Sequence, residues 1–162
     1  MKVDYLMWAV VLGLAGFVVT QAVRSALRRP RIVAGLGLVR QNLGLIAVGA
    51  FVGAAAYLPS HTSLTSSGML GWVLSLVFAT VSVPIYFVVD ATFSLWGFWG
   101  QIGLWVVVAL AACLYHGALA VWLGNVYRRE PRRAVLIGSA ILGVHFGVYV
   151  IWQALSVAQA AS

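Results

Sequence analysis

The sequence predicts an all-α protein, a bundle of helices that crosses a lipid bilayer several times. Of its 162 residues, 63% are hydrophobic and only 8% are charged, and the mean hydropathy is +1.02. A soluble domain keeps about a quarter of its residues charged, so this chain has too few charged side chains to cover a water-facing surface. Its apolar residues also form long uninterrupted runs. We therefore expect a single integral-membrane domain over residues 1–162.

Five apolar stretches divide the chain, at residues 5–23, 41–58, 69–89, 102–126 and 134–156. Each has about the 17–25 residues that a helix needs to cross the hydrocarbon core. The first ends before Arg24, and the second begins at the polar step Arg40-Gln41-Asn42. The fourth ends at the basic turn after Tyr127. Pro131 is placed to open the last helix, because the first helical residue needs no N–H group.

The third stretch decides how many helices cross. If all five cross, the two basic loops face opposite sides and each side of the membrane carries five Lys/Arg residues, with Lys2 counted beside the second loop, which gives no preferred orientation. If residues 69–101 dip in and return, both loops are cytoplasmic. Nine of the ten Lys/Arg residues then lie on the cytoplasmic side and one lies on the other side. Pro84, Asp90, Gly97 and Gly100 favour such a dip. We predict four spanning helices plus a hydrophobic re-entrant or interfacial hairpin at 69–101, with five spanning helices as the alternative.

The positive charge is concentrated in two short regions. The net charge is +7, and nine of the ten Lys/Arg residues fall within residues 24–40 and 128–133. Such loops act as topology signals and contact anionic lipid headgroups, whereas nucleic-acid binding is not expected without a soluble domain. The residues given this role are Arg24, Arg28, Arg29, Arg31, Arg128, Arg129, Arg132 and Arg133. We expect an integral protein of the bacterial cytoplasmic (inner) membrane.

Arg40 and Asp90 are possible buried polar groups. If the second helix starts at Gln41, Arg40 extends to the headgroups. If it starts at Ile32, Arg40 lies about 10 Å deep and needs an anionic partner. Asp90 is costly at depth in the same way.

His116 and His145 form the best candidate site. Counted from Glu130, they lie 14 residues back and 15 residues forward. At 1.5 Å per residue, this places both imidazoles about 20 Å from the turn, level with each other on antiparallel helices. Intramembrane polar groups are expensive and are often functional.

Several chemistries suit this histidine pair, so its cofactor stays open. The imidazoles are suited to bind haem b as axial ligands, to hold a transition metal together with Cys113, or to pass protons or bind a quinone-like head group. Tyr149, one turn after His145, is a further contact residue. The structural alternative is that each histidine only joins neighbouring helices by a hydrogen bond.

Catalysis by this chain alone is not expected, because three acidic residues supply no carboxylate pair and no Ser/His/Asp grouping. Small residues four apart, Gly49 with Gly53 and Gly143 with Gly147, favour close contact between helices. We predict a small subunit or homo-oligomer of a membrane assembly, with partners among lipids, further copies or other membrane subunits. The alternatives are a haem- or quinone-binding redox subunit and a small channel or transporter.

Overall fold

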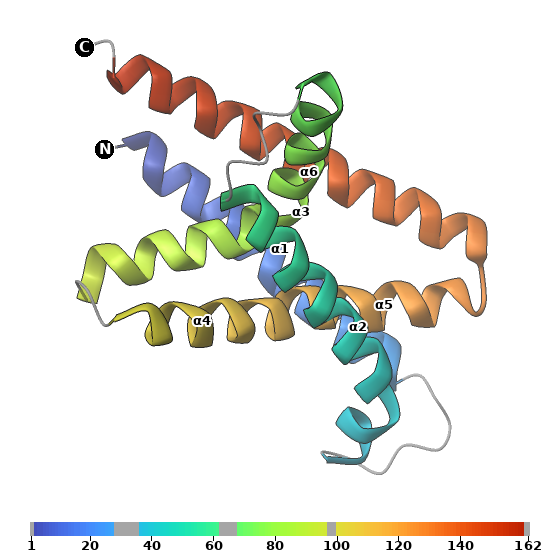
Figure 1. The fold of residues 1–162 in the computed structure, drawn as a ribbon. Helices are drawn as coiled ribbons and strands as arrows, with labels where there is room; N and C mark the ends of the chain where they lie inside the picture. The colour runs from blue at the N-terminus through green and yellow to red at the C-terminus, as the bar shows by residue number, and fades with distance from the viewer. Residues whose placement is uncertain (1, 28–35, 62–67, 97–99, 161–162) are drawn as a thin grey trace.

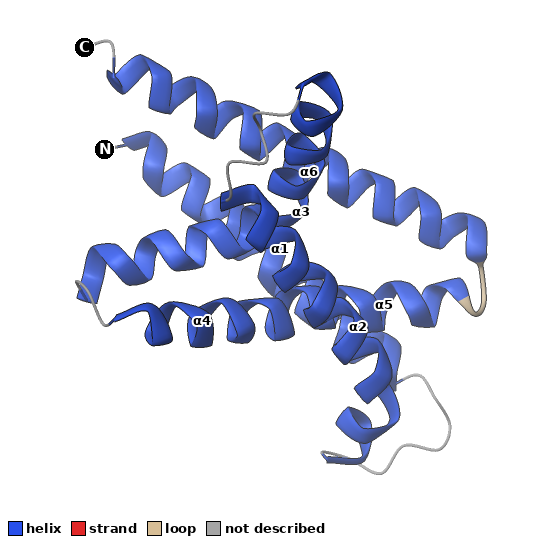
Figure 2. Ribbon diagram, in the orientation of Figure 1, coloured by secondary structure: helices blue, strands red, loops and turns tan. Residues whose placement is uncertain are grey.

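The computed structural model describes residues 2–27, 36–61, 68–96 and 100–160, and all of these except 128–130 lie in helices. Figure 2 shows the helical content. The helices are α1 (Lys2–Leu27), α2 (Leu36–His61), α3 (Gly68–Trp96), α4 (Gly100–Ala111), α5 (Ala118–Tyr127) and α6 (Pro131–Ala160), and the π-helix η2 (Ala112–Gly117) joins α4 to α5. The predicted all-α class is confirmed, and Pro131 does open the last helix.

Among the described residues, four helices are long and apolar enough to cross a membrane, at Ala9–Leu27, Gly68–Asp90, Trp105–Tyr127 and Pro131–Ala158. The prediction of four spanning helices is therefore confirmed. The shorter apolar helix, however, is Asn42–Tyr57 within α2. The assignment of the fifth, non-spanning element to residues 69–101 is corrected accordingly.

Residues 68–96 form one helix, α3, with Pro84 inside it. Figure 1 shows that the first half of α3 is steeply inclined to its second half, which runs beside α4. Proline removes one helical hydrogen bond and clashes with the carbonyl four residues earlier. The proline therefore bends the helix and does not divide it into the two arms of a re-entrant hairpin.

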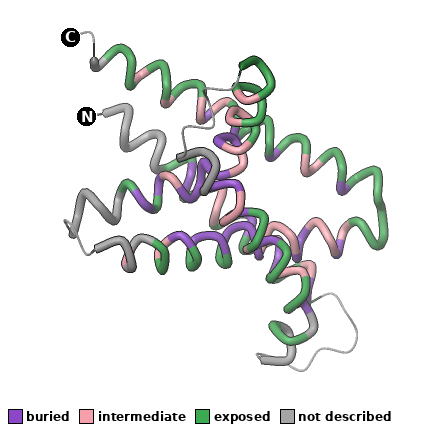
Figure 3. Tube along the Cα trace, viewed as in Figure 1, coloured by how far each residue is buried: buried purple, intermediate pink, exposed green. Residues whose placement is uncertain are grey.

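The α4–η2–α5 segment is a continuous rod around which the other helices pack. Its α5 end contacts α1 and α6, η2 contacts α2, and α4 contacts α3. Figure 1 shows α6 diverging from the rod beyond the turn at 128–130, toward the end where both termini lie. The buried residues are concentrated where the helices cross (Figure 3). This crossing region holds the two histidines.

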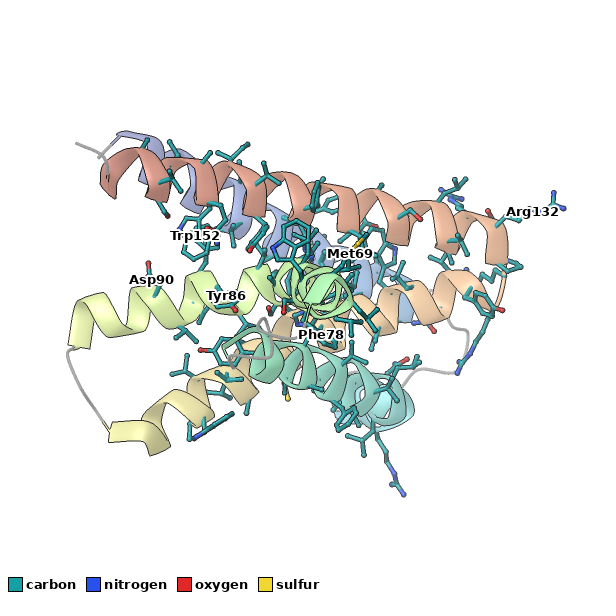
Figure 4. All side chains as sticks on the ribbon, turned by 45° about the horizontal axis from the view of Figure 1, so that its top comes forward. Met69, Phe78, Tyr86, Asp90, Arg132 and Trp152 are labelled. Carbon is teal, nitrogen blue, oxygen red and sulfur yellow. The ribbon has the colours of Figure 1, made fainter. Side chains whose placement is uncertain are left out.

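Three arginines of α1 and the α5–α6 turn gather at one end of the molecule, called here the basic end. Arg24 of α1 lines the same cleft as Arg129 and Arg133 of the α5–α6 turn. Asn125 donates to the Ser25 hydroxyl over 3.3 Å, which joins α5 to the last turns of α1. In Figure 4, Arg132 and Asp90 lie at opposite ends of the molecule. This arrangement agrees with the topology in which both basic regions share one side.

Candidate functional site

The π-helix η2 carries two of the three residues that form a buried polar core. Tyr115 and His116 lie within its wide turn and are 5% and 4% exposed. The third residue, His145 of α6, is 1% exposed. We call these three residues the tyrosine–histidine core. Single π-turns inside α-helices are frequent at functional sites. The tyrosine–histidine core is therefore a candidate functional site.

Tyr115 contacts both imidazoles. Its hydroxyl lies 2.6 Å from Nε2 of His145. Its ring contacts both histidine rings, with centroid distances of 5.2 Å to His116 and 5.5 Å to His145. The equal spacing of the histidines from Glu130 is followed by contact of both imidazoles with one tyrosine ring, and their common depth in a bilayer stays a prediction. Tyr115 was not singled out from the sequence, although it directly precedes His116.

His116 connects η2 to the bend in α3. Its Nε2 lies 2.8 Å from the carbonyl oxygen of Val81, so Nε2 carries the hydrogen and donates it. Val81 lies three residues before Pro84, in the turn where the proline disturbs the helical hydrogen bonds. His116 thus supplies a donor to a carbonyl of the bent turn, where lipid offers none.

Two hydroxyl groups support the same bent turn. Ser82 is fully buried, and its hydroxyl donates to the carbonyl of Phe78 at 2.7 Å. The Thr80 hydroxyl donates to the carbonyl of Leu76 at 2.8 Å. Such bonds from Ser and Thr to the preceding turn bend helices. The bend in α3 therefore results from Pro84 together with three polar side chains, those of Thr80, Ser82 and His116.

Two glycines of α2 allow His116 to sit at this position. A Cβ atom built on Gly49 meets the backbone of His116 at 2.1 Å, and one built on Gly53 meets its Nδ1 at 2.5 Å. Both distances are too short for any side chain. The spacing of Gly49 and Gly53 therefore serves the contact of α2 with η2, inside one chain, and this face is not open for association between chains.

Both histidines keep one buried nitrogen without a protein partner. Within the described part of the chain, Nδ1 of His116 and Nδ1 of His145 have no hydrogen-bond partner. Because Nε2 of His116 carries the hydrogen, Nδ1 of its neutral ring is a bare lone pair. An unpaired polar atom in a low-dielectric interior costs free energy. These two atoms are the positions at which the core can still accept or donate a hydrogen bond.

A haem between the two imidazoles does not fit this arrangement. Both Nε2 atoms already contact protein atoms, the Val81 carbonyl and the Tyr115 hydroxyl. The ring of Tyr115 contacts both imidazoles, in the space that a porphyrin would need. The two histidines are also almost fully buried, which denies access to a quinone head group unless the helices move.

The metal site expected from Cys113, His116 and His145 is not assembled. Cys113 is exposed whereas His116 is buried, because the wide π-turn places them on different faces of the rod. The prediction that Cys113 and His116 share one face of the helix assumed regular α-helical spacing. Among the described residues, no three His, Cys, Asp or Glu side chains are grouped as metal ligands.

The remaining predicted residues lie apart from the core. Tyr149 is half-buried and packs with Val11, Val83, Phe87 and Val148, so the hydroxyl that contacts His145 belongs to Tyr115 instead. Arg40 and Asp90 are exposed at the surface of the single chain, and α2 begins at Leu36, ahead of Arg40. The depth of both side chains in a bilayer stays a prediction. Arg24, Arg128, Arg129, Arg132 and Arg133 are also exposed. Arg28, Arg29 and Arg31 lie outside the described residues.

Comparison with known proteins identifies no relative of this chain. No protein family model, no curated protein sequence and no solved structure matches the chain.

Proposed function

We propose that the protein is a self-associating subunit of a membrane assembly, with α6 as the contact between copies. The observation that carries the proposal is the open face at Gly143 and Gly147, where an added Cβ atom meets nothing within 4 Å. Ser139, one turn earlier, is exposed and extends this face. Small residues four apart let two membrane helices approach closely.

The second glycine pair of the chain supports this interpretation. Gly49 and Gly53 have the same spacing and are already covered by His116. On α6, His145 lies between the two glycines in sequence but is buried against Tyr115. One side of α6 thus serves the core, and the glycine side is left for a partner helix. A second copy of α6 is the simplest partner with a matching surface.

The other functions receive less support. A haem or quinone function needs access that the buried histidines do not offer. An antiparallel pore needs copies inserted in both orientations, whereas the shared basic end favours one orientation. We propose the bacterial inner membrane as the location and a non-catalytic role for this chain.

The proposal is tested by the oligomeric state of the purified protein in lipid nanodiscs and mild detergent. We expect the wild type to form a dimer or larger oligomer, and Gly143→Leu and Gly147→Leu to shift it toward monomer. Gly44→Leu is the matched control, since Gly44 also has nothing within 4 Å of an added Cβ but lies on α2.

Cysteine cross-linking locates the contact. In a Cys113→Ala background, Ser139→Cys is expected to form a disulfide between copies in membranes. A monomeric wild type, or equal loss of the oligomer in Gly44→Leu, would refute α6 as the interface.

A further inference from the structure

A cleft of about 600 Å³ opens at the basic end between α1, α5 and α6. Its size lies within the roughly 300–1,000 Å³ typical of small-molecule sites. Its lining contains no residue of the tyrosine–histidine core and neither Gly143 nor Gly147. We call it the arginine cleft, after the arginines at its mouth.

The mouth of the arginine cleft carries an excess of positive charge from three elements. Arg24 comes from the last turn of α1, Arg129 from the turn after α5, and Arg133 from the first turn of α6. Glu130 is the one acidic side chain among its lining residues, and it is paired with Arg133 at 3.3 Å. The net formal charge of these four side chains is +2. The positive end of the α6 helix dipole adds to this field.

The inner part of the arginine cleft is apolar. Trp122 and Ile141 are 8% and 7% exposed and line its wall. Phe17 packs edge-on against Trp122 with a centroid distance of 5.5 Å. Ala140 and Val144 continue the apolar lining along α6. Polarity thus falls from the arginines at the mouth toward the middle of the membrane span.

We propose that this cleft binds one membrane amphiphile that has a phosphate-monoester head group and a long hydrocarbon chain. The head group contacts Arg24, Arg129 and Arg133, because guanidinium groups bind phosphate oxygens in pairs. A phosphate monoester carries about −1.5 to −2 charge near neutral pH, which matches the charge of the mouth. The chain lies along Phe17, Trp122 and Ile141. A zwitterionic lipid brings no net charge to the mouth and is expected to bind more weakly.

The test is native mass spectrometry of the purified protein, titrated with dioleoyl phosphatidic acid and, separately, with dioleoyl phosphatidylcholine. We expect one preferred phosphatidic acid per chain. The double variant Arg24→Gln with Arg129→Gln is expected to weaken it by roughly tenfold or more, the size expected for lost charge-assisted hydrogen bonds. Arg128→Gln with Arg132→Gln is the matched control, because it removes the same charge from the basic end at positions outside the cleft lining.

A second pair of variants tests the apolar part. Ala140→Trp fills the cleft without changing charge, and we expect it to abolish the preferred site. Leu142→Trp places the same ring on an exposed position of α6 outside the lining and is expected to bind like the wild type. Excess inorganic phosphate is the competitor that separates a free anion from a lipid.

The outcomes separate the possibilities. Loss in both the Arg24/Arg129 and Ala140 variants, with both controls unchanged, supports the proposal. Equal loss in the Arg128/Arg132 control indicates general attraction of anionic lipid and overturns it. Displacement by inorganic phosphate together with normal binding in Ala140→Trp indicates a free phosphate site and also overturns it.

Discussion

At the residue scale, Tyr115 ties η2 to α6 through a single hydroxyl group. Its 2.6 Å contact with His145 lies among residues that are almost fully buried. Water is absent from the hydrocarbon core, so neither group has a ready alternative partner once the contact is lost. The contact therefore joins two helices that diverge elsewhere, and it explains why a buried histidine is tolerated on α6.

We expect Tyr115→Phe to destabilise the protein by about 1 kcal/mol, the usual size of a hydrogen bond between membrane helices. The substitution keeps the ring and removes only the hydroxyl, so Nε2 of His145 loses its described partner. The measurement is the unfolding free energy in lipid bicelles. Tyr127→Phe is the control, because Tyr127 is 59% exposed on the same rod. Equal destabilisation by both substitutions would contradict the role given to Tyr115.

At the scale of the element, α3 shows how a membrane helix continues through a proline. Pro84 removes a donor from the ladder. The hydroxyls of Thr80 and Ser82 add hydrogen bonds to the carbonyls of Leu76 and Phe78, one turn before the bend, and the imidazole of His116 donates to the carbonyl of Val81 in the bent turn. Because the donor from His116 comes from inside the bundle, a carbonyl of the bent turn has a hydrogen-bond partner where lipid offers none. His116 is thus a structural partner of α3 as well as a member of the core.

We expect Pro84→Ala to straighten α3. Spin labels at Leu70 and Val88, both exposed and on either side of the bend, report the change when Cys113 is replaced by alanine. A straight helix places these Cα positions about 27 Å apart, and the bent wild type is expected to give a shorter distance. The Pro131→Ala variant is the control, because Pro131 begins a helix and its replacement leaves α3 unchanged. Identical distances in wild type and Pro84→Ala would contradict a proline-dependent bend.

At the scale of the whole molecule, charge is distributed between two unlike ends. Arg24, Arg129, Arg132 and Arg133 lie at or beside the α5–α6 turn, whereas Asp90 lies at the far end in Figure 4. Cytoplasmic loops of membrane proteins are rich in Lys and Arg. The shared basic end therefore predicts one preferred orientation, whereas five crossing helices with equal Lys/Arg counts on the two sides would predict none.

We expect Arg132→Cys to react with a membrane-impermeant maleimide only from the cytoplasmic side, and Asp90→Cys only from the opposite side. Both variants are made in the Cys113→Ala background, and inverted and right-side-out vesicles separate the two sides. The unmodified Cys113→Ala protein gives the background signal. Labelling of both cysteines from one side would contradict this orientation.

Hydropathy and residue counts predict much of this architecture. The lengths of the apolar stretches predict helices of membrane-spanning length, Pro131 predicts where the last helix begins, and the equal distances from Glu130 predict that the two histidines lie near each other. Contacts between helices depend on how each helix is rotated, which the pattern does not encode. The single π-turn is enough to place Cys113 and His116 on different faces. Regular α-helical spacing therefore predicts neither the contact of Tyr115 with His145 nor that of Gly53 with His116.

The π-helix η2 has a consequence for insertions and deletions. A regular α-helix turns by about 100° per residue. The wide turn at Ala112–Gly117 therefore changes the direction in which the side chains of α4 point relative to those of α5. One rod can then present its apolar side to α3 in one half and to α1 in the other. A one-residue deletion within η2 that restored regular winding would turn one half away from its neighbours, so we expect the chain to tolerate many substitutions there but no change of length.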